Sequence, residues 1–137
     1  MRQTLLRAWV LLAIAHSGAA LAACQNTTVP TVPNLQGKWI LESIGGHAIE
    51  SETEIYFKID GLTISGFDGC NLFGGLLDKP KELRIGQRAC PSDSPRLPLQ
   101  LSDPRAQLES SELDGDTLDL VLADESGKAR FRRQRED

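Results

Sequence analysis

The sequence has few histidines, cysteines and methionines. Its 137 residues include two histidines, three cysteines and one methionine. One of the histidines, His47, lies in a Gly45-Gly46-His47 stretch that predicts an exposed loop. The sequence contains neither a Gly-x-Ser-x-Gly nucleophile elbow nor a glycine-rich phosphate loop ending in Lys-Ser/Thr. We therefore predict a protein that is not an enzyme and needs no cofactor.

Metal-ligand patterns are equally sparse. Cys70, Cys90 and His47 would supply three soft ligands without the paired Cys-x-x-Cys spacing of zinc sites. The segment Asp114-Gly115-Asp116 begins like a calcium loop, but Leu118 stands where that loop needs its third oxygen ligand. The sequence therefore predicts no metal site.

A long hydrophobic run of membrane-spanning length is also missing. Residues 8–15 are continuously apolar and follow Arg2 and Arg7. A membrane-spanning helix needs roughly 20 apolar residues, so this run is too short. A basic start, a short apolar core and small residues form the secretory pattern. Residues 1–23 are therefore predicted to be a signal peptide.

The signal ends in Leu21-Ala22-Ala23-Cys24, which resembles the bacterial lipobox. The resemblance implies that the Cys24 thiol receives a diacylglycerol and that cleavage occurs just before it, so that a lipid anchor holds the chain at the membrane. The alternative is an ordinary signal peptide that leaves Cys24 free or in a disulfide. Gln25, in place of an aspartate, favours the outer membrane of a Gram-negative envelope, with the domain facing the periplasm.

The charge balance limits the partners of the mature chain. Removing residues 1–23 takes away two arginines and no acidic residue, so the net charge changes from −4 to −6. This acidity argues against nucleic acid, which calls for a basic stripe, and against anionic lipid headgroups. A basic cluster at residues 128–135 is interpreted as the solvated face of a last strand.

Two cysteines remain if Cys24 carries lipid. Cys70 and Cys90 would meet an oxidising compartment after export, where disulfides form and persist. Closing a loop of about 20 residues would contribute about 3 kcal/mol. We predict this disulfide; the alternative is two separate buried thiols that pack as small hydrophobes.

The rest of the chain divides into a tether, a domain and a tail. Residues 24–34 contain two prolines and small polar side chains and are predicted to be a flexible tether. Residues 35–133 form the domain, and residues 134–137 are a polar tail. Apolar residues alternate in the domain, as at Ile55, Phe57 and Ile59, which predicts strands. Strands are predicted at 38–44, 54–59, 62–66, 72–77, 82–85, 107–113, 116–122 and 128–133.

Two Asp-Gly pairs, Asp60-Gly61 and Asp114-Gly115, predict hairpins. A single short helix is predicted at 94–101, ended by Pro104. Many short strands with close turn signals indicate a mainly β fold, α+β at most. We expect a small antiparallel sheet or barrel with one short helix.

One segment carries a family resemblance. Gly69-Cys70-Asn71-Leu72-Phe73-Gly74-Gly75 resembles the Gly-Cys-Asn-x-Phe/Tyr-x-Gly core of the META domain, the family of the bacterial heat-shock protein HslJ. Trp39 resembles the tryptophan of that family's opening strand, and Ala89-Cys90 resembles the end of its second motif. Gln87 stands near where the family commonly has threonine, and three prolines interrupt the helical region. The family motif is matched at Trp39, Gly69, Cys70, Asn71, Phe73, Gly75, Ala89 and Cys90.

The motif has a structural interpretation. Its glycines (66, 69, 74 and 75) permit positive φ or close backbone approach. Asn71 tolerates the left-handed region and can bond its own backbone. Phe67 and Phe73 are expected to enter the core.

The resemblance implies a lipocalin-like or barrel-like antiparallel domain linked to stress response and envelope integrity. We therefore expect a non-catalytic envelope lipoprotein in stress tolerance or envelope maintenance, with an envelope protein as partner. One alternative is an anchored inhibitor of a secreted enzyme such as lysozyme, because a −6 surface would attract a basic enzyme. Another is a small-ligand carrier, although a barrel this small is usually filled by side chains.

Overall fold

The structure, a computed structural model, describes residues 31–135. The predicted signal peptide, the lipidation site Cys24 and most of the predicted tether lie outside the described residues. Within residues 31–135, no helix has the length and apolarity needed to cross a membrane.

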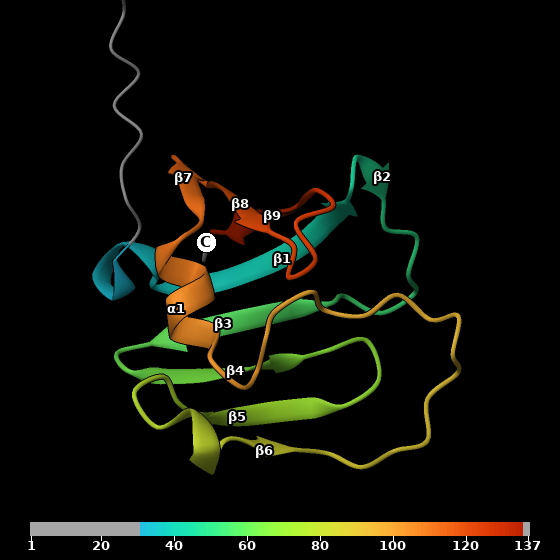
Figure 1. Ribbon diagram of the computed structural model, residues 1–137, viewed down its shortest axis with the longest axis horizontal. Coiled ribbons are helices and arrows are strands. Elements are labelled where there is room, and N and C mark those ends of the chain that lie inside the picture. Colours follow the sequence, from blue (N-terminus) through green and yellow to red (C-terminus); the bar gives the residue numbers. More distant parts are fainter. Residues whose placement is uncertain (1–30, 136–137) are drawn as a thin grey trace, which may run out of the picture.

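Nine antiparallel strands form one sheet in the described part of the chain (Figure 1). The order across the sheet is β6-β5-β4-β3-β1-β9-β8-β7, and β2 pairs with one end of β1. The strands are β1 (Gly37–Ile44), β2 (His47–Ala48), β3 (Tyr56–Asp60), β4 (Thr63–Phe67), β5 (Leu72–Leu76), β6 (Arg84–Ile85), β7 (Glu112–Asp114), β8 (Thr117–Val121) and β9 (Lys128–Gln134). The predicted mainly β, antiparallel fold is confirmed, and the sheet is open rather than closed.

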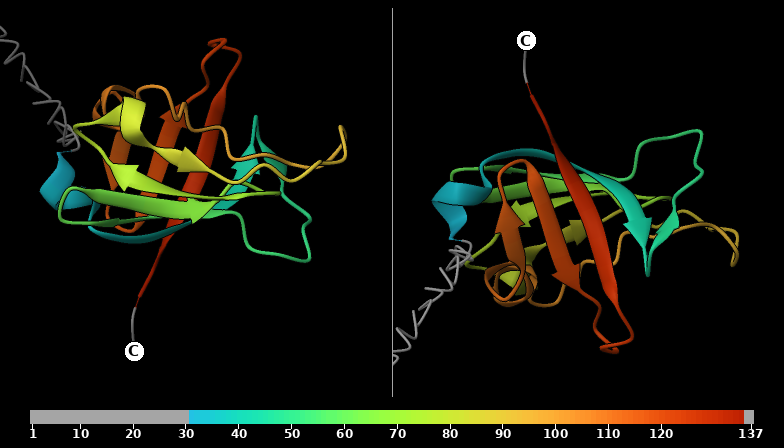
Figure 2. Two further views of the ribbon diagram at one scale, coloured as in Figure 1. Left: turned by 90° about the horizontal axis from the view of Figure 1, so that it is seen from below. Right: turned by 90° about the horizontal axis from the view of Figure 1, so that it is seen from above.

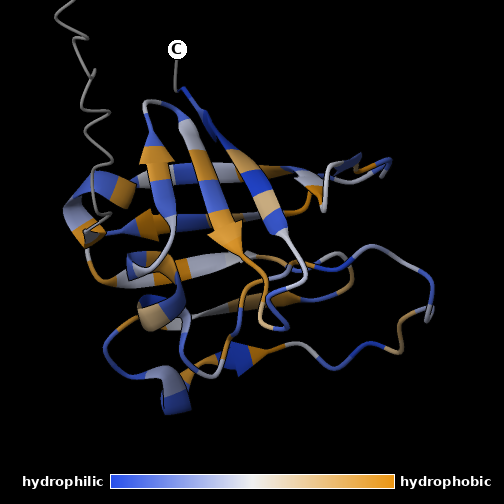
Figure 3. Cartoon of the chain, turned by 45° about the horizontal axis from the view of Figure 1, so that its top comes forward, coloured by the Kyte–Doolittle hydropathy of each residue, from blue (hydrophilic) through white to orange (hydrophobic). Residues whose placement is uncertain are grey.

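The sheet bends around its central strand β1, so its two halves cross and enclose the core (Figure 2). Apolar and polar residues alternate along the strands (Figure 3). Trp39, Phe57 and Phe131 meet inside with no exposed surface. Ring centroids lie 6.5 Å apart between Trp39 and Phe57, and 5.2 Å apart between Phe57 and Phe131. Side chains therefore fill the space between the two halves.

Both predicted hairpins are present, each displaced by one residue. Asp60 pairs with Thr63, so the loop of the first hairpin is Gly61-Leu62 rather than Asp60-Gly61. Gly115 likewise opens the loop of the β7–β8 hairpin. The φ angles of Gly61 and Gly115 are +60° and +57°. Positive φ at the first loop residue is what the mirror-image hairpin turns require.

The prediction of a helix at residues 94–101 is wrong. That segment is an extended loop that buries Leu97 and Leu99, two residues apart, against the sheet. The helix α1 (Pro104–Glu109) begins at the proline that was expected to end one. Asp103 caps it by accepting a bond from the Ala106 N–H at 3.3 Å, and proline suits the first helical position because its missing N–H is not needed there.

Three other boundaries differ from the prediction. The strand predicted at 107–113 is helical at its start, and only β7 is a strand there. The strand predicted at 82–85 shrinks to β6, because the 3-10 helix η2 (Pro80–Glu82) precedes it. The last tether residues belong to a second 3-10 helix, η1 (Val32–Leu35), whose Val32 and Leu35 are buried. The packed domain therefore begins at Val32 rather than Leu35.

The basic cluster near the C-terminus is the solvated face of β9, as interpreted. Arg130 binds Asp119 and Arg132 binds Glu42, at 2.8 and 2.7 Å. Arg133 of the same cluster instead turns towards the core, where its guanidinium lies 4.5 Å from the Trp39 ring centre. The acidic residues of β8 and β1 thus neutralise much of this cluster.

Candidate functional site

The turn between β4 and β5 is closed by one carboxylate. Asp68 Oδ1 accepts hydrogen bonds from the backbone N–H groups of Cys70 and Asn71, at 2.8 and 2.6 Å. The Asp68 N–H in turn donates to the Asn71 carbonyl at 2.9 Å. Gly69 has a φ of +101°, and a Cβ at this position would overlap the carbonyl of Pro95. Aspartate and glycine are therefore both required by the shape of this turn.

Asp68 also holds the extended loop at residues 94–101 in place. Asp68 Oδ2 lies 2.8 Å from Arg96 Nη2, and the Leu97 N–H donates to the Asp68 carbonyl at 2.8 Å. Asp68 is buried. Burial alone would raise the pKa of this carboxyl, but the N–H groups of Asn71 and Cys70 together with Arg96 outweigh it and lower the pKa below its ordinary value. Asp68 is therefore held as a carboxylate that binds Arg96, while its backbone carbonyl holds Leu97 beside the sheet.

The two cysteine-bearing segments meet beside this turn. The sulfur atoms of Cys70 and Cys90 lie at disulfide-bonding distance, with 5.8 Å between the Cα atoms, as is typical of disulfides. The predicted pair is confirmed, and the alternative of two separate buried thiols is wrong. Each cysteine is only partly buried.

Asn71 joins the same two segments through its side chain. Its Oδ1 accepts a hydrogen bond from the Arg88 N–H at 2.7 Å, and its Nδ2 donates to Cys90 Sγ at 3.4 Å. The Gly86 N–H donates to the Leu72 carbonyl at 2.9 Å. Asparagine tolerates the left-handed region and can bond its own backbone, but Asn71 does neither here. It instead holds residues 86–90 against the start of β5.

The two phenylalanines of this region lie on opposite faces of the sheet. Phe73 is buried, and its ring lies so close to Gly66 that a Cβ there would come within 2.7 Å of it. Phe67 is paired with Leu72 on the outer face and is only partly buried. The expectation that Phe67 enters the core is wrong, because alternation along β4 gives the inward positions to Ile64 and Gly66.

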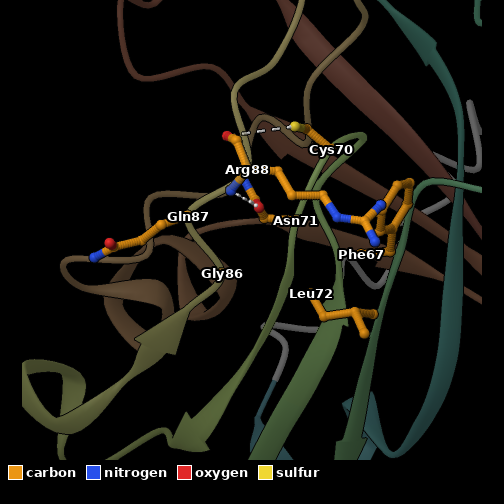
Figure 4. A pocket seen from close by; sticks show the side chains of 7 residues that line it. All are labelled: Phe67, Cys70, Asn71, Leu72, Gly86, Gln87 and Arg88. Atoms are coloured by element: carbon orange, nitrogen blue, oxygen red, sulfur yellow. Dashed lines mark hydrogen bonds between the residues drawn. The ribbon is translucent and has the colours of Figure 1, made fainter.

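A groove opens on the outer face where these segments meet. Its volume is about 370 Å³, and it is lined by Phe67, Cys70, Asn71, Leu72, Gly86, Gln87 and Arg88. The Leu72 side chain is 66% exposed. The Arg88 side chain extends across the groove towards Phe67 (Figure 4). The sequence motif includes Cys70, Asn71 and Cys90. It did not predict Phe67, Leu72 or Arg88 as residues of a site.

Comparison with known proteins decides the family. The META domain model matches residues 33–137. The chain belongs to the META domain family. No curated protein matches the chain, and no solved structure matches it.

The META motif residues divide between two tasks. Trp39 and Phe73 are core residues, and the Trp39 indole N–H donates to the Leu35 carbonyl at 2.9 Å. Gly75 lets Leu83 approach the sheet, since a Cβ there would lie 2.8 Å from its side chain. Cys70 and Asn71 line the groove, Gly69 shapes the turn that holds them, Cys90 pairs with Cys70, and Ala89 is exposed.

His47, the remaining candidate metal ligand, does not line the groove. His47 is exposed in β2. Within residues 31–135 no group of three or more histidine, cysteine, aspartate or glutamate side chains is placed to hold a metal ion. The groove is the candidate functional site of this META domain because the motif residues Cys70 and Asn71 line it, and it places an arginine beside apolar side chains.

Proposed function

We propose that this META domain serves as a non-catalytic binding module of the bacterial envelope, in stress tolerance or envelope maintenance. A lipid on Cys24 holds it at the outer membrane, facing the periplasm. The lipobox resemblance of Leu21-Ala22-Ala23-Cys24 supports the anchor, and the Gln25 that follows supports the outer membrane. The Cys70–Cys90 pair suits an exported protein, because disulfides persist in oxidising compartments.

One observation carries the binding role. The motif residues Asn71, Cys70 and Cys90 are engaged in bonds that hold residues 86–90 in place. These bonds shape a groove that has an exposed leucine, Leu72, and an arginine, Arg88, at its surface. Aromatic side chains and arginines are enriched in protein–protein interfaces, and this groove combines the two.

A deletion strain of the organism that carries this chain tests the role. We expect the strain to become more sensitive to heat, detergent or hydrophobic antibiotics, and expression of the wild-type chain to restore resistance. Unchanged sensitivity across all three stresses would contradict a role in envelope maintenance.

The anchor has its own test. We expect the wild-type chain in the outer-membrane fraction, with a mass that includes diacylglycerol on Cys24. The Cys24→Ser variant is expected in the soluble periplasmic fraction if it is still exported. The Cys70→Ser variant is the matched control, and it should remain in the membrane. Membrane association of Cys24→Ser equal to that of the wild type would refute lipidation at this residue.

A further inference from the structure

The outer face of the sheet carries a row of apolar side chains that ends at the groove. The strand register places Ile40 opposite Tyr56, Tyr56 opposite Phe67, and Phe67 opposite Leu72. Directly opposed residues in antiparallel strands lie on the same face. Ile40, Tyr56 and Phe67 are partly buried, whereas Leu72 is 66% exposed. The row is therefore most accessible where the groove lies.

Cations accompany this row. The next row on the same face contains Lys38 opposite Lys58, and Arg84 opposite Gly74. Lys38 is paired with Glu54 at 2.7 Å and also lies 4.4 Å from the Tyr56 ring centre. Within residues 31–135, neither Arg84 nor Arg88 forms an ion pair. Two exposed guanidinium groups thus flank an apolar surface on an acidic chain.

The backbone of Arg88 is fixed before any ligand arrives. Its N–H is bound by Asn71, and the disulfide cysteine Cys90 follows two residues later. An arginine held in this way loses less freedom on binding an anion, and its planar donors match a carboxylate bidentately. The apolar wall beside it, Leu72 and Phe67, calls for an apolar group next to that carboxylate.

We propose that the groove docks an extended peptide segment of a partner protein, in which an acidic side chain stands beside a large apolar one. The carboxylate binds the Arg88 guanidinium, and the apolar side chain packs on Leu72 and Phe67. The proposal rests on the proposed role of the domain as an envelope binding module and gives the chemistry of its partner.

The shape of the surface favours a polypeptide over a small molecule. Sites for small molecules bury about 70–90% of the ligand, whereas the main apolar wall of this groove, Leu72, is itself 66% exposed. An extended chain can continue from the groove along the row towards Tyr56 and bury more surface.

The position of the groove favours a partner protein over the anchoring membrane. Gln36, just after the chain enters the domain, bonds the backbone of Gly61 at the β3–β4 turn. The groove lies at the β4–β5 turn, at the opposite end of these strands (Figure 1). The five residues of β4 separate the two ends by about 15 Å.

Selection from a displayed library of random hexapeptides tests the proposal, with the purified full-length chain as bait. We expect the selected peptides to carry aspartate or glutamate within two positions of leucine, isoleucine or phenylalanine. Fluorescence anisotropy then compares the affinity of selected peptides for the wild type and for variants. Arg88→Gln and Leu72→Ser should each weaken binding about tenfold, as loss of one charge-assisted bond or one apolar contact implies.

Two controls match these variants. Arg105→Gln removes an exposed arginine on α1, where it pairs with Glu109, and Leu62→Ser removes a 47% exposed leucine at the far turn. Both should bind the peptides within about twofold of the wild type, as expected for surface changes away from the site.

Three results would overturn the proposal. They are the absence of any enriched acidic–apolar sequence, equal affinity of Arg88→Gln and the wild type, and binding to anionic phospholipid vesicles with no peptide binding. None of them bears on the phenotype of the deletion strain. Failure of the peptide chemistry is therefore distinguishable from failure of the envelope role.

Discussion

The side-chain oxygen of Asn71 accepts a hydrogen bond from the backbone N–H of Arg88 at 2.7 Å. This bond joins two segments of the META motif that are 17 positions apart in the chain. The disulfide between Cys70 and Cys90 reinforces the same junction. The two motif segments thus act together, and the position of Arg88 is the result.

The Asn71→Ala variant tests this junction. The change leaves the partly buried Arg88 N–H without its acceptor and removes the donor to Cys90 Sγ. We expect the free energy of unfolding to fall by about 1–3 kcal/mol, as for loss of a buried partner. Urea unfolding measures it. The exposed Asn34→Ala is the matched control and should change stability by less than about 0.5 kcal/mol. Equal stability of the two variants would show that the bond contributes nothing.

Gly66 and Gly74 differ in the space available for a side chain. A Cβ at Gly66 would overlap the Tyr56 carbonyl and lie 2.7 Å from the Phe73 ring, whereas the nearest atom to a Cβ at Gly74 is 3.6 Å away. Gly66→Ala should therefore lower the free energy of unfolding by about 1–3 kcal/mol or more, as overpacking does. Gly74→Ala should lie within about 0.5 kcal/mol of the wild type. Thermal unfolding of both compares them, and equal melting temperatures would be inconsistent with this packing.

Asp68 makes stability depend on pH. Its pKa in the folded state lies below its ordinary value of 3.8, so its ionised form stabilises the fold above that value. This contribution is present at neutral pH and is lost as the pH falls below about 3.8 towards the folded-state pKa. The difference in unfolding free energy between wild type and Asp68→Asn should therefore shrink as the pH falls from 5 to 2.

Urea unfolding at several pH values measures this difference. The pKa of Asp119 is also lowered below its ordinary value, by its bond to Arg130. The Asp119→Asn variant shows how much of the acid sensitivity arises there. A difference between wild type and Asp68→Asn that stays constant with pH would contradict the ionised state of Asp68.

The disulfide should stabilise the domain. The bond spans 20 positions, and closing a loop of that size contributes about 3 kcal/mol. Adding a thiol reductant should therefore lower the melting temperature of the wild type. The Cys70→Ser/Cys90→Ser double variant should melt lower without reductant and should not respond to it. If reductant has no effect on the wild type, the disulfide is absent or contributes nothing.

The core strands could be predicted because their signal is local. Ile55, Phe57 and Ile59 alternate with polar residues, and all three are buried. A helix was wrongly predicted at residues 94–101 because Leu97 and Leu101 are spaced as on a helix. Leu97 and Leu99 are buried and Leu101 packs partly buried against the core, all at strand spacing, because the bond from Leu97 to Asp68 holds the segment extended. The real helix buries only two residues, Pro104 and Leu108, too few to show a period.

The site could be predicted only in part for a similar reason. Cysteines and a Gly-Cys-Asn sequence are visible without a structure, so the disulfide was predictable. Arg88 gains its importance from contacts with Asn71 and from the absence of an acidic partner within residues 31–135. Leu72 is notable only because the register places it outward, opposite Phe67. Neither property is encoded in neighbouring residues.

We propose that the META motif positions Arg88 for a partner in the envelope. Complementation of the deletion strain with the Arg88→Gln chain is the sharpest test, with Arg105→Gln as the control and immunoblots to equalise the amount of protein. We expect Arg88→Gln to be stable and membrane-bound but to fail to restore resistance to detergent and heat, while Arg105→Gln restores it. Full restoration of resistance by Arg88→Gln would show that Arg88 is not needed for the envelope role.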